Sequence, residues 1–270
     1  MDFDNKQGMN SLLQPLLEGA KTTQFDESWT QGRSAFGGLS AAFAVSAMRN
    51  TLGSALPMRS LMVSFIAPLP AGEVEVDATI QRQGKNVTQM AGAVYSGGTL
   101  CLQAMAAFGT GRDELVVPST AAQPPSKDAG MQIADHRRRL PAFLEYFEGT
   151  WVSKGLPFSG QCSNRLDMWV RHRSDMENFA TEKLVSIADI PPPVVLSYFD
   201  KPPVPASSLT WSLEFVQSPE QIESDWFFLE FTAESAAEGY TQQSGRIYTE
   251  TGELCALTRQ CMVYFGNRTG

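Results

Sequence analysis

The sequence is short of the residues and runs that mark several common protein classes. Its 270 residues include only two histidines and four cysteines, and 19% of the residues are charged. No apolar run approaches the roughly 18 to 20 residues needed to span a bilayer. The acidic first residues, Met1-Asp2-Phe3-Asp4, lack the basic start and apolar core of a signal peptide. We therefore expect a cytoplasmic protein without membrane insertion.

The scarcity of cysteine and histidine also argues against a metal centre. No C-x-x-C pair occurs, and no histidine cluster lies near any of the cysteines, which are Cys101, Cys162, Cys255 and Cys261. The phosphate-loop, dinucleotide and nucleophile-elbow motifs are missing as well. We expect no metal, no cofactor and no disulfide framework. His172, between two arginines, is interpreted as a surface histidine at the end of a strand.

Positive charge is also in short supply. The formal net charge is −8 and the isoelectric point is near 4.9, which argues against a general nucleic-acid or anionic-membrane binder. One basic run, residues 136–139, is interpreted as a solvated surface. The hydrophobic fraction of 43% is high enough for one large domain or two ordinary ones with real cores.

The first half reads as one helix followed by an antiparallel meander. Phe36-Gly37-Gly38 opens an alanine-rich run whose large apolar residues have helical spacing up to Leu52, and Gly53 is suited to end it. Because charge is nearly absent before Arg49, this helix is expected to be buried all round. Alternating patterns then predict strands over residues 61–65, 74–81, 87–95 and 99–108.

The second half repeats this plan after a stretch poor in large apolar residues. We expect an N-terminal unit over residues 1–115, a linker over 116–145 and a C-terminal unit over 146–270. The second unit is predicted to contain a helix over residues 181–190, stopped by three prolines, and strands over 151–158, 162–172, 226–233, 240–249 and 254–265.

Two similar endings indicate an internal duplication. "LQAMAAFG" at residues 102–109 and "RQCMVYFG" at residues 259–266 share a Gln-x-Met-x-x-Phe-Gly pattern. Both follow a tyrosine, a turn and a Leu-Cys pair, as in Tyr95 to Cys101 and Tyr248 to Cys255. Gln103 is then interpreted as the relic counterpart of Gln260.

Three segments carry a resemblance to a known family: "FGGLSAAFAVSAM", "SLMVSFIAPLPAGEVEVDATIQRQGKNV" and "GRIYTETGELCALTRQCMVYF". They resemble the tandem, or double-hotdog, acyl-CoA thioesterases, a thioesterase-like superfamily that includes acyl-CoA thioesterase II. The resemblance implies an α+β double hotdog, with two helix-wrapped antiparallel sheets joined in tandem into one continuous sheet. It further implies an acyl-CoA substrate, a role in fatty acid metabolism and a homo-oligomer formed through the sheets.

The same resemblance implies hydrolysis by a water that an Asp, a Gln and a Ser or Thr position. Gln260 matches the family Gln. Thr232 is the preferred match for the family Ser or Thr, with Ser235 as the alternative. Thr210 stands where relatives similar to acyl-CoA thioesterase II carry the Asp. Glu214 shares the strand face of Thr210, although a solvent-facing glutamate is the favoured interpretation.

Substrate binding is expected at two further places. Gly37 and Gly38, at the start of the first helix, match the backbone amide that faces the thioester carbonyl in hotdog thioesterases, and a tight loop-to-helix turn is an equally good interpretation. Arg82 and Lys85 resemble a family hairpin that could contact coenzyme A phosphates. Here a basic surface turn is the favoured interpretation.

Two alternatives to hydrolysis remain open from the sequence. Loss of the acid at Thr210 would suit a catalytically weak or inactive acyl-thioester binding protein with the same fold. A double-hotdog hydratase or dehydratase is disfavoured, because no His and Asp or Glu pair occurs at that type of motif.

Overall fold

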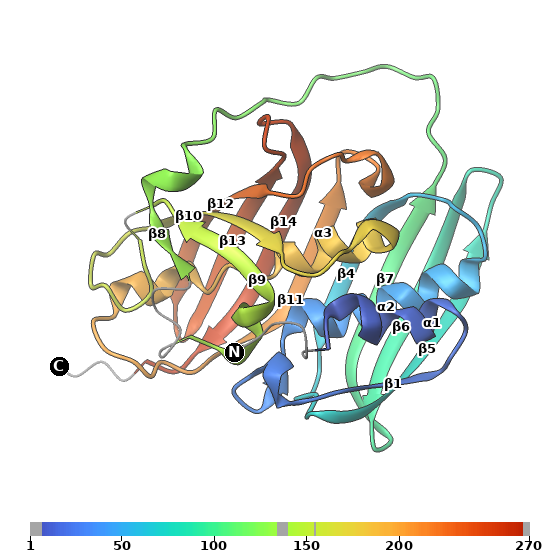
Figure 1. Cartoon of the computed structure of the whole chain (residues 1–270), viewed down its shortest axis with the longest axis horizontal. Coiled ribbons are helices and arrows are strands. Elements are labelled where there is room, and N and C mark those ends of the chain that lie inside the picture. Colours follow the sequence, from blue (N-terminus) through green and yellow to red (C-terminus); the bar gives the residue numbers. More distant parts are fainter. Residues whose placement is uncertain (1–6, 134–139, 154, 267–270) are drawn as a thin grey trace.

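The computed structural model describes residues 7–133, 140–153 and 155–266. Its main feature is one 12-stranded antiparallel sheet with the order β1-β5-β6-β7-β4-β11-β14-β13-β12-β10-β9-β8 (Figure 1). Strands β4 and β11 pair in the middle of this order, with Leu61 opposite Leu213. The predicted continuous sheet across both halves is therefore confirmed.

The helices and strands have the following bounds. The α-helices are α1 (Met9–Leu17), α2 (Gly37–Leu52) and α3 (Ala180–Ala188). The first half supplies β1 (Thr22–Phe25), β4 (Met58–Phe65), β5 (Gly72–Gln83), β6 (Val87–Ser96) and β7 (Thr99–Gly109), and the short pair β2 (Thr30–Gln31) and β3 (Ser34–Ala35). The rest are β8 (Met131–Gln132), β9 (Phe147–Trp151), β10 (Arg165–His172), β11 (Ala206–Phe215), β12 (Phe227–Ala237), β13 (Tyr240–Tyr248) and β14 (Leu254–Tyr264).

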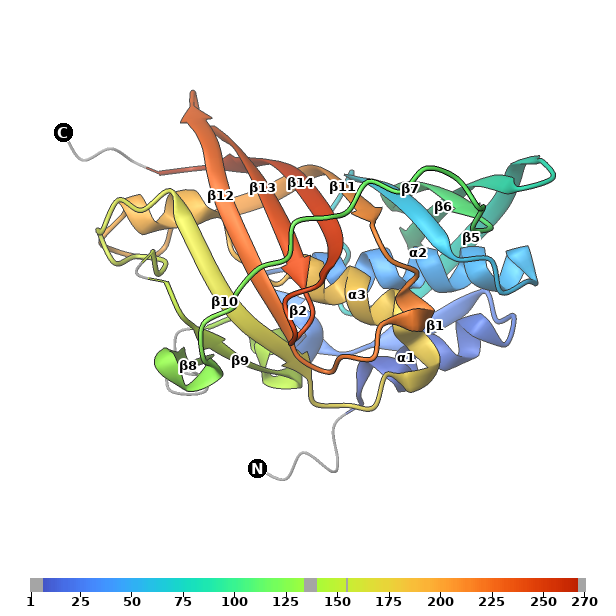
Figure 2. The same cartoon turned by 90° about the horizontal axis from the view of Figure 1, so that it is seen from above.

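All three α-helices lie on one side of the sheet, here called the inner face (Figure 2). Helix α2 packs against β5, β6 and β7, and it also packs against α3 and α1. Every residue from Gly38 to Met48 is buried, as the lack of charge predicts, and Gly53 ends the helix with a positive φ of 61°. In the described part of the chain, no helix is both long and apolar enough to cross a membrane.

One charge pair, between a buried Glu182 and a partly exposed Arg49, links the central helices of the two halves. Glu182 of α3 is completely buried and accepts hydrogen bonds from Ser46 Oγ at 2.8 Å and from Arg49 Nη1 at 2.5 Å, both on α2. Burial raises the pKa of Glu182, while Arg49 and Ser46 lower it. This contact joins α2 to α3.

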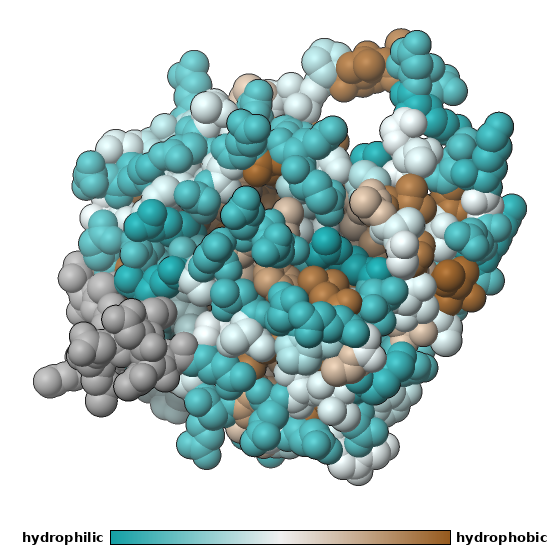
Figure 3. Space-filling model, turned by 45° about the vertical axis from the view of Figure 1, so that its right-hand side comes forward, coloured by the Kyte–Doolittle hydropathy of each residue, from teal (hydrophilic) through white to brown (hydrophobic). Residues whose placement is uncertain are grey.

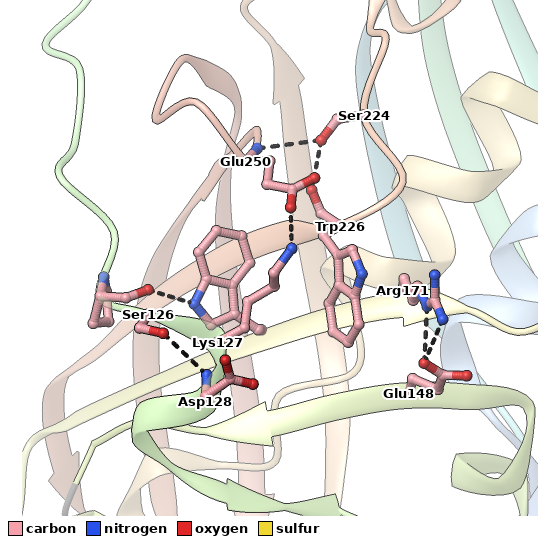
Figure 4. Close-up of polar contacts among 10 residues, drawn as sticks. Ser126, Lys127, Asp128, Glu148, Arg171, Ser224, Trp226 and Glu250 are labelled. Atoms are coloured by element: carbon pink, nitrogen blue, oxygen red, sulfur yellow. Dashed lines mark hydrogen bonds and ion pairs between the residues drawn. The ribbon is translucent and has the colours of Figure 1, made fainter.

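The segment that connects the two halves packs against the outer face of the second half. Trp169 Nε1 donates to the carbonyl of Pro125 at 2.9 Å, and the Lys127 ammonium lies 5.2 Å from the Trp226 ring centroid. Lys127 also pairs with Glu250, which points toward it from the β13–β14 turn (Figure 4). The expected linker thus includes a docked segment and the edge strand β8, while residues 136–139 lie outside the described residues.

Most of the surface seen in Figure 3 is hydrophilic, with apolar residues in small separate groups. Three consecutive apolar residues in the connecting segment are nearly fully exposed, namely Leu115, Val116 and Val117.

Several predictions about local structure are wrong. The strand expected over residues 151–158 is β9, which ends at Trp151, and β10 starts at Arg165. Helix α1, which packs on α2, was not predicted at all. His172 is buried rather than exposed, because its ring lies between Phe147 and the Ser186 hydroxyl. Burial lowers the pKa of His172 to about 3, so the ring is neutral.

The two Gln-x-Met endings do not occupy equivalent faces. Gln103 and Met105 on β7 are exposed, whereas Gln260 and Met262 on β14 are buried. A shift of one residue in a strand moves every side chain to the other face. Gln103 is therefore not the structural counterpart of Gln260, although the tandem arrangement itself holds.

Candidate active site

A row of inward side chains crosses the junction between the halves. In the strand register, Val63 of β4 lies opposite Trp211 of β11, Trp211 opposite Gln260 of β14, and Gln260 opposite Gln243 of β13. Because directly opposed residues share a face, these four side chains line the inner face together. The two glutamines are buried polar groups in a mainly apolar layer, so they need hydrogen-bond partners.

Those partners form a continuous chain of hydrogen bonds. The backbone N–H of Val194 donates to Gln243 Oε1 at 3.0 Å, and Gln243 Nε2 donates to Gln260 Oε1 at 2.8 Å. Gln260 Nε2 then donates to Asp189 Oδ1 at 2.6 Å. The chain ends on a carboxylate, the strongest acceptor available to it.

Asp189 follows the last turn of α3, where Pro191-Pro192-Pro193 forbids further helix. The residue is only partly accessible, and loss of solvent raises the pKa of its carboxyl from the ordinary value of 3.8 to about 7. Hydrogen bonds from Gln260 and from the backbone of Gly38 oppose that rise. No ion pair to Asp189 occurs within the described residues.

The start of α2 approaches this carboxyl closely because it is made of glycine. A Cβ on Gly37 would lie 2.5 Å from Asp189 Oδ2 and 3.1 Å from the Phe65 ring. A Cβ on Gly38 would lie 2.6 Å from the Phe36 ring and 2.9 Å from Ser186 Cα. A side chain at either position would force a neighbouring group to shift, so both glycines allow the close packing found here.

This arrangement is suited to proton transfer beside a group that develops negative charge. One carboxylate oxygen, Oδ1, is held by Gln260, while Oδ2 faces the start of α2. The first backbone N–H groups of a helix lack intrahelical acceptors and carry partial positive charge.

In the part of the chain that the structure describes, no group of three or more His, Cys, Asp or Glu side chains could hold a metal ion.

The structure brings some of the sequence-predicted residues together and separates others. Gln260, Gly37 and Gly38 all meet at Asp189. Thr210 is exposed and pairs with Cys261 and Ser64 on the outer face, and Glu214 is exposed on the same face.

Thr232 also lies away from Gln260, on the outer face of the sheet. It is half-buried on β12, opposite Arg165 and Ser244, while its neighbour Phe231 points into the core. Neither threonine is brought to the Gln260 side chain.

The two basic residues lie at the β5–β6 turn, separate from the Asp189 site. Arg82 and Lys85 line a surface pocket of about 320 Å³ together with Arg112, Asn86 and Gln89. Both side chains are exposed.

Sequence reasoning did not single out Asp189 or Gln243. A signal for Asp189 was present, since it is an isolated acid between apolar residues, two positions before the prolines that follow α3. Gln243 gave less indication, because it stands beside Gln242 and only the strand register decides which of the two points inward.

Two family models match the chain. One describes an acyl-CoA thioesterase N-terminal domain and matches residues 25–109, and the other describes an acyl-CoA thioesterase C-terminal domain and matches residues 118–264. The comparison with curated proteins gave no significant match.

Solved structures share the fold at low sequence identity. A protein of unknown function with a hotdog fold from Alicyclobacillus acidocaldarius has a TM-score of 0.79 and 18% identity, covering 91% of this chain and 92% of its own. The tesB protein of Mycobacterium avium subspecies paratuberculosis has a TM-score of 0.75 and 18% identity, with coverages of 94% and 98%. Acyl-CoA thioesterase II TesB2 of Mycobacterium marinum has a TM-score of 0.71 and 16% identity, with coverages of 96% and 100%.

Proposed function

Because this chain belongs to the acyl-CoA thioesterase family, with an N-terminal and a C-terminal thioesterase domain in tandem, we propose that it hydrolyses an acyl-CoA thioester. The observation that carries the proposal is the Asp189 carboxyl, held between Gln260 and the start of α2 with a pKa of about 7. A general base works best when its pKa lies near the operating pH.

In the proposed reaction, Asp189 Oδ2 takes a proton from a water molecule as the water oxygen attacks the thioester carbonyl carbon. The carbonyl oxygen becomes an oxyanion, which the positive end of the α2 dipole stabilises, while the Gly38 N–H donates to Asp189. Collapse of this tetrahedral intermediate breaks the carbon–sulfur bond and releases the thiolate of coenzyme A. The proton held by Asp189 then passes to the thiolate or to solvent.

Gln260 has two roles in this proposal. Its Nε2 group donates to Asp189 Oδ1 and so orients the carboxylate with Oδ2 toward the start of α2. The same hydrogen bond stabilises the ionised form that accepts the proton. Asp189 supplies the carboxylate that is missing at Thr210, so the proposed reaction does not depend on Thr210 or Thr232.

Arg82 and Lys85 are proposed to contact the phosphate groups of coenzyme A. Support comes from the pocket at the β5–β6 turn, where Arg112 adds a third cation. Clustered cations suit a ligand that carries several phosphate charges. Hydrolysis of acyl-CoA in the cytoplasm would give this protein a role in fatty acid metabolism.

The test is release of free thiol from a panel of acyl-CoA substrates of different chain length. We expect turnover by the wild type, and a loss of roughly 10²-fold to 10⁴-fold in kcat for Asp189→Asn, which keeps the shape but not the basicity. Gln260→Ala should lower kcat by about 10²-fold with little change in KM. Acyl-CoA binding without turnover in the wild type would instead support the alternative, an inactive acyl-thioester binding protein.

A further inference from the structure

Gln243 is a completely buried amide that makes two hydrogen bonds through its side chain. It does not reach Asp189 itself, since its contacts are Val194 and Gln260. Burying an amide costs free energy unless its polar atoms are hydrogen-bonded. An apolar residue could fill this strand position without that cost. A buried glutamine at this position therefore indicates a specific hydrogen-bonding role.

The donors and acceptors in the chain of hydrogen bonds follow one fixed order from Val194 to Asp189. The Val194 backbone N–H can only donate, so it fixes Oε1 of Gln243 toward Val194 and Nε2 toward Gln260. Nε2 can only donate as well, so Gln260 must present Oε1 to Gln243. That leaves Nε2 of Gln260, and no other atom of its amide, to face Asp189.

We propose that Gln243 is a positioning residue of the candidate active site, which holds the Gln260 amide with its N–H toward Asp189. The inference rests on the proposed function, in which Asp189 is the reacting base. Gln243 acts on the reaction only through Gln260. The backbone of Val194 provides the fixed reference, because it follows the three prolines that also end α3.

Two substitutions disturb the chain of hydrogen bonds from Val194 to Asp189 in different ways. Gln243→Leu removes both hydrogen bonds, so the Gln260 amide can rotate by half a turn and place Oε1 against Asp189. In Gln243→Glu, an ionised carboxylate would accept from Val194 and also from Nε2 of Gln260, which forces Oε1 toward Asp189. Two facing acceptors favour a proton on Asp189, so both variants should hold its carboxyl in the protonated form to higher pH.

Gln242→Leu is the matched control. Gln242 is the preceding residue of the same strand and pairs with Cys261, and its side chain belongs to the outer face. The Gln-to-Leu change at this position leaves the hydrogen bonds among Val194, Gln243, Gln260 and Asp189 in place. All variants are first checked for native circular dichroism and cooperative unfolding.

The experiment follows the Asp189 carboxyl by ¹³C NMR during a pH titration, and in parallel measures kcat and KM on an acyl-CoA substrate. Gln243→Leu and Gln243→Glu should shift the Asp189 titration upward by about one pH unit or more, which is a tenfold change in its ionisation constant. Because Asp189 with a pKa of about 7 is half ionised at pH 7, a rise of one unit should lower kcat at that pH by about fivefold, with KM within twofold. Gln242→Leu should change neither.

A folded Gln243→Leu or Gln243→Glu variant with an unchanged Asp189 titration would overturn the positioning role. If the wild type lacks hydrolase activity but the titration still moves in both Gln243 variants and not in Gln242→Leu, the positioning role stands and the proposed function fails. If the titration moves while kcat at pH 7 stays at the wild-type value, the role in catalysis is overturned.

Discussion

Asp189 and Gln260 are 71 residues apart in the sequence, yet a single hydrogen bond of 2.6 Å joins their side chains. Asp189 ends the second central helix and Gln260 lies on the last strand, while the start of the first central helix closes over the same carboxyl. The candidate site therefore needs both halves of the chain. Neither half would contain it alone.

The first prediction concerns the pH dependence of hydrolysis. Asp189 must be ionised to act as a base, and its pKa is raised to about 7. The value of kcat/KM should therefore rise with pH and level off above about pH 8, with a midpoint near 7. A profile of kcat/KM from pH 5 to pH 9 checks this. A midpoint near 4 would show that the reacting carboxyl is an ordinary, solvated one.

The second prediction concerns the pH dependence of stability. The native pKa of Asp189, about 7, lies above the ordinary value of 3.8, so the native state keeps a proton that the unfolded state loses. The stability linked to this proton is complete below about pH 4 and is lost as the pH rises to 7, at up to about 1.4 kcal/mol per pH unit.

Urea unfolding of wild type and Asp189→Asn at several pH values measures this linkage. The free energy of unfolding of Asp189→Asn, minus that of the wild type, should increase between pH 4 and pH 7 and then stay constant. A difference that is flat over this range would mean that Asp189 titrates normally in the folded protein. Glu182 is present in both proteins and cancels in the comparison.

Gly37 provides the third prediction. A methyl group at this position would meet Asp189 Oδ2 at 2.5 Å, so Gly37→Ala must displace the carboxyl or the start of α2. We expect a loss of at least 10²-fold in kcat, because catalytic groups tolerate little misplacement. Gly111→Ala is the control, since a Cβ there meets nothing within 4 Å. Equal activity of the two variants would remove Gly37 from the site.

Features that depend on a local sequence pattern could be predicted from the sequence, whereas features that depend on contacts between distant residues could not. Helix α2 was predictable with its buried character and its glycine end, because its pattern is local. Gln260 and the two glycines were found through family resemblance. Asp189 was not, because its importance arises from a contact with Gln260 that exists only in the folded chain.

The same limit explains the errors in the duplicated endings and at His172. Matching letters in two strands do not fix which face each strand presents, and Gln103 and Gln260 face opposite ways. His172 is flanked by arginines in the sequence, but strand alternation turns those side chains outward and the histidine inward. Arg171 and Arg173 pair instead with Glu148.

The fourth prediction separates the sequence-derived site from the structural one. Family resemblance assigns catalytic positions to Thr210 and Thr232, whereas both lie on the outer face, away from Gln260. Thr210→Ala and Thr232→Ala should therefore keep kcat within about twofold of wild type, as expected for surface substitutions with little effect on the fold. A loss near 10²-fold in either variant would show that the outer face takes part in the reaction.

The last prediction tests the contact that holds the two central helices together. Glu182 is completely buried, and Arg49 is its charged partner across the junction between the halves. Removing one member of such a pair leaves an uncompensated charge, so Glu182→Met should lower the free energy of unfolding by about 3 kcal/mol.

The double variant Glu182→Met with Arg49→Met removes both charges and keeps comparable side-chain volume. It should recover most of that loss, because apolar residues can replace a buried ion pair with little cost. Urea unfolding of the two single variants, the double variant and wild type gives the coupling energy directly. If the losses in the two single variants simply add in the double variant, Glu182 and Arg49 are not coupled, and the junction between α2 and α3 depends on apolar packing alone.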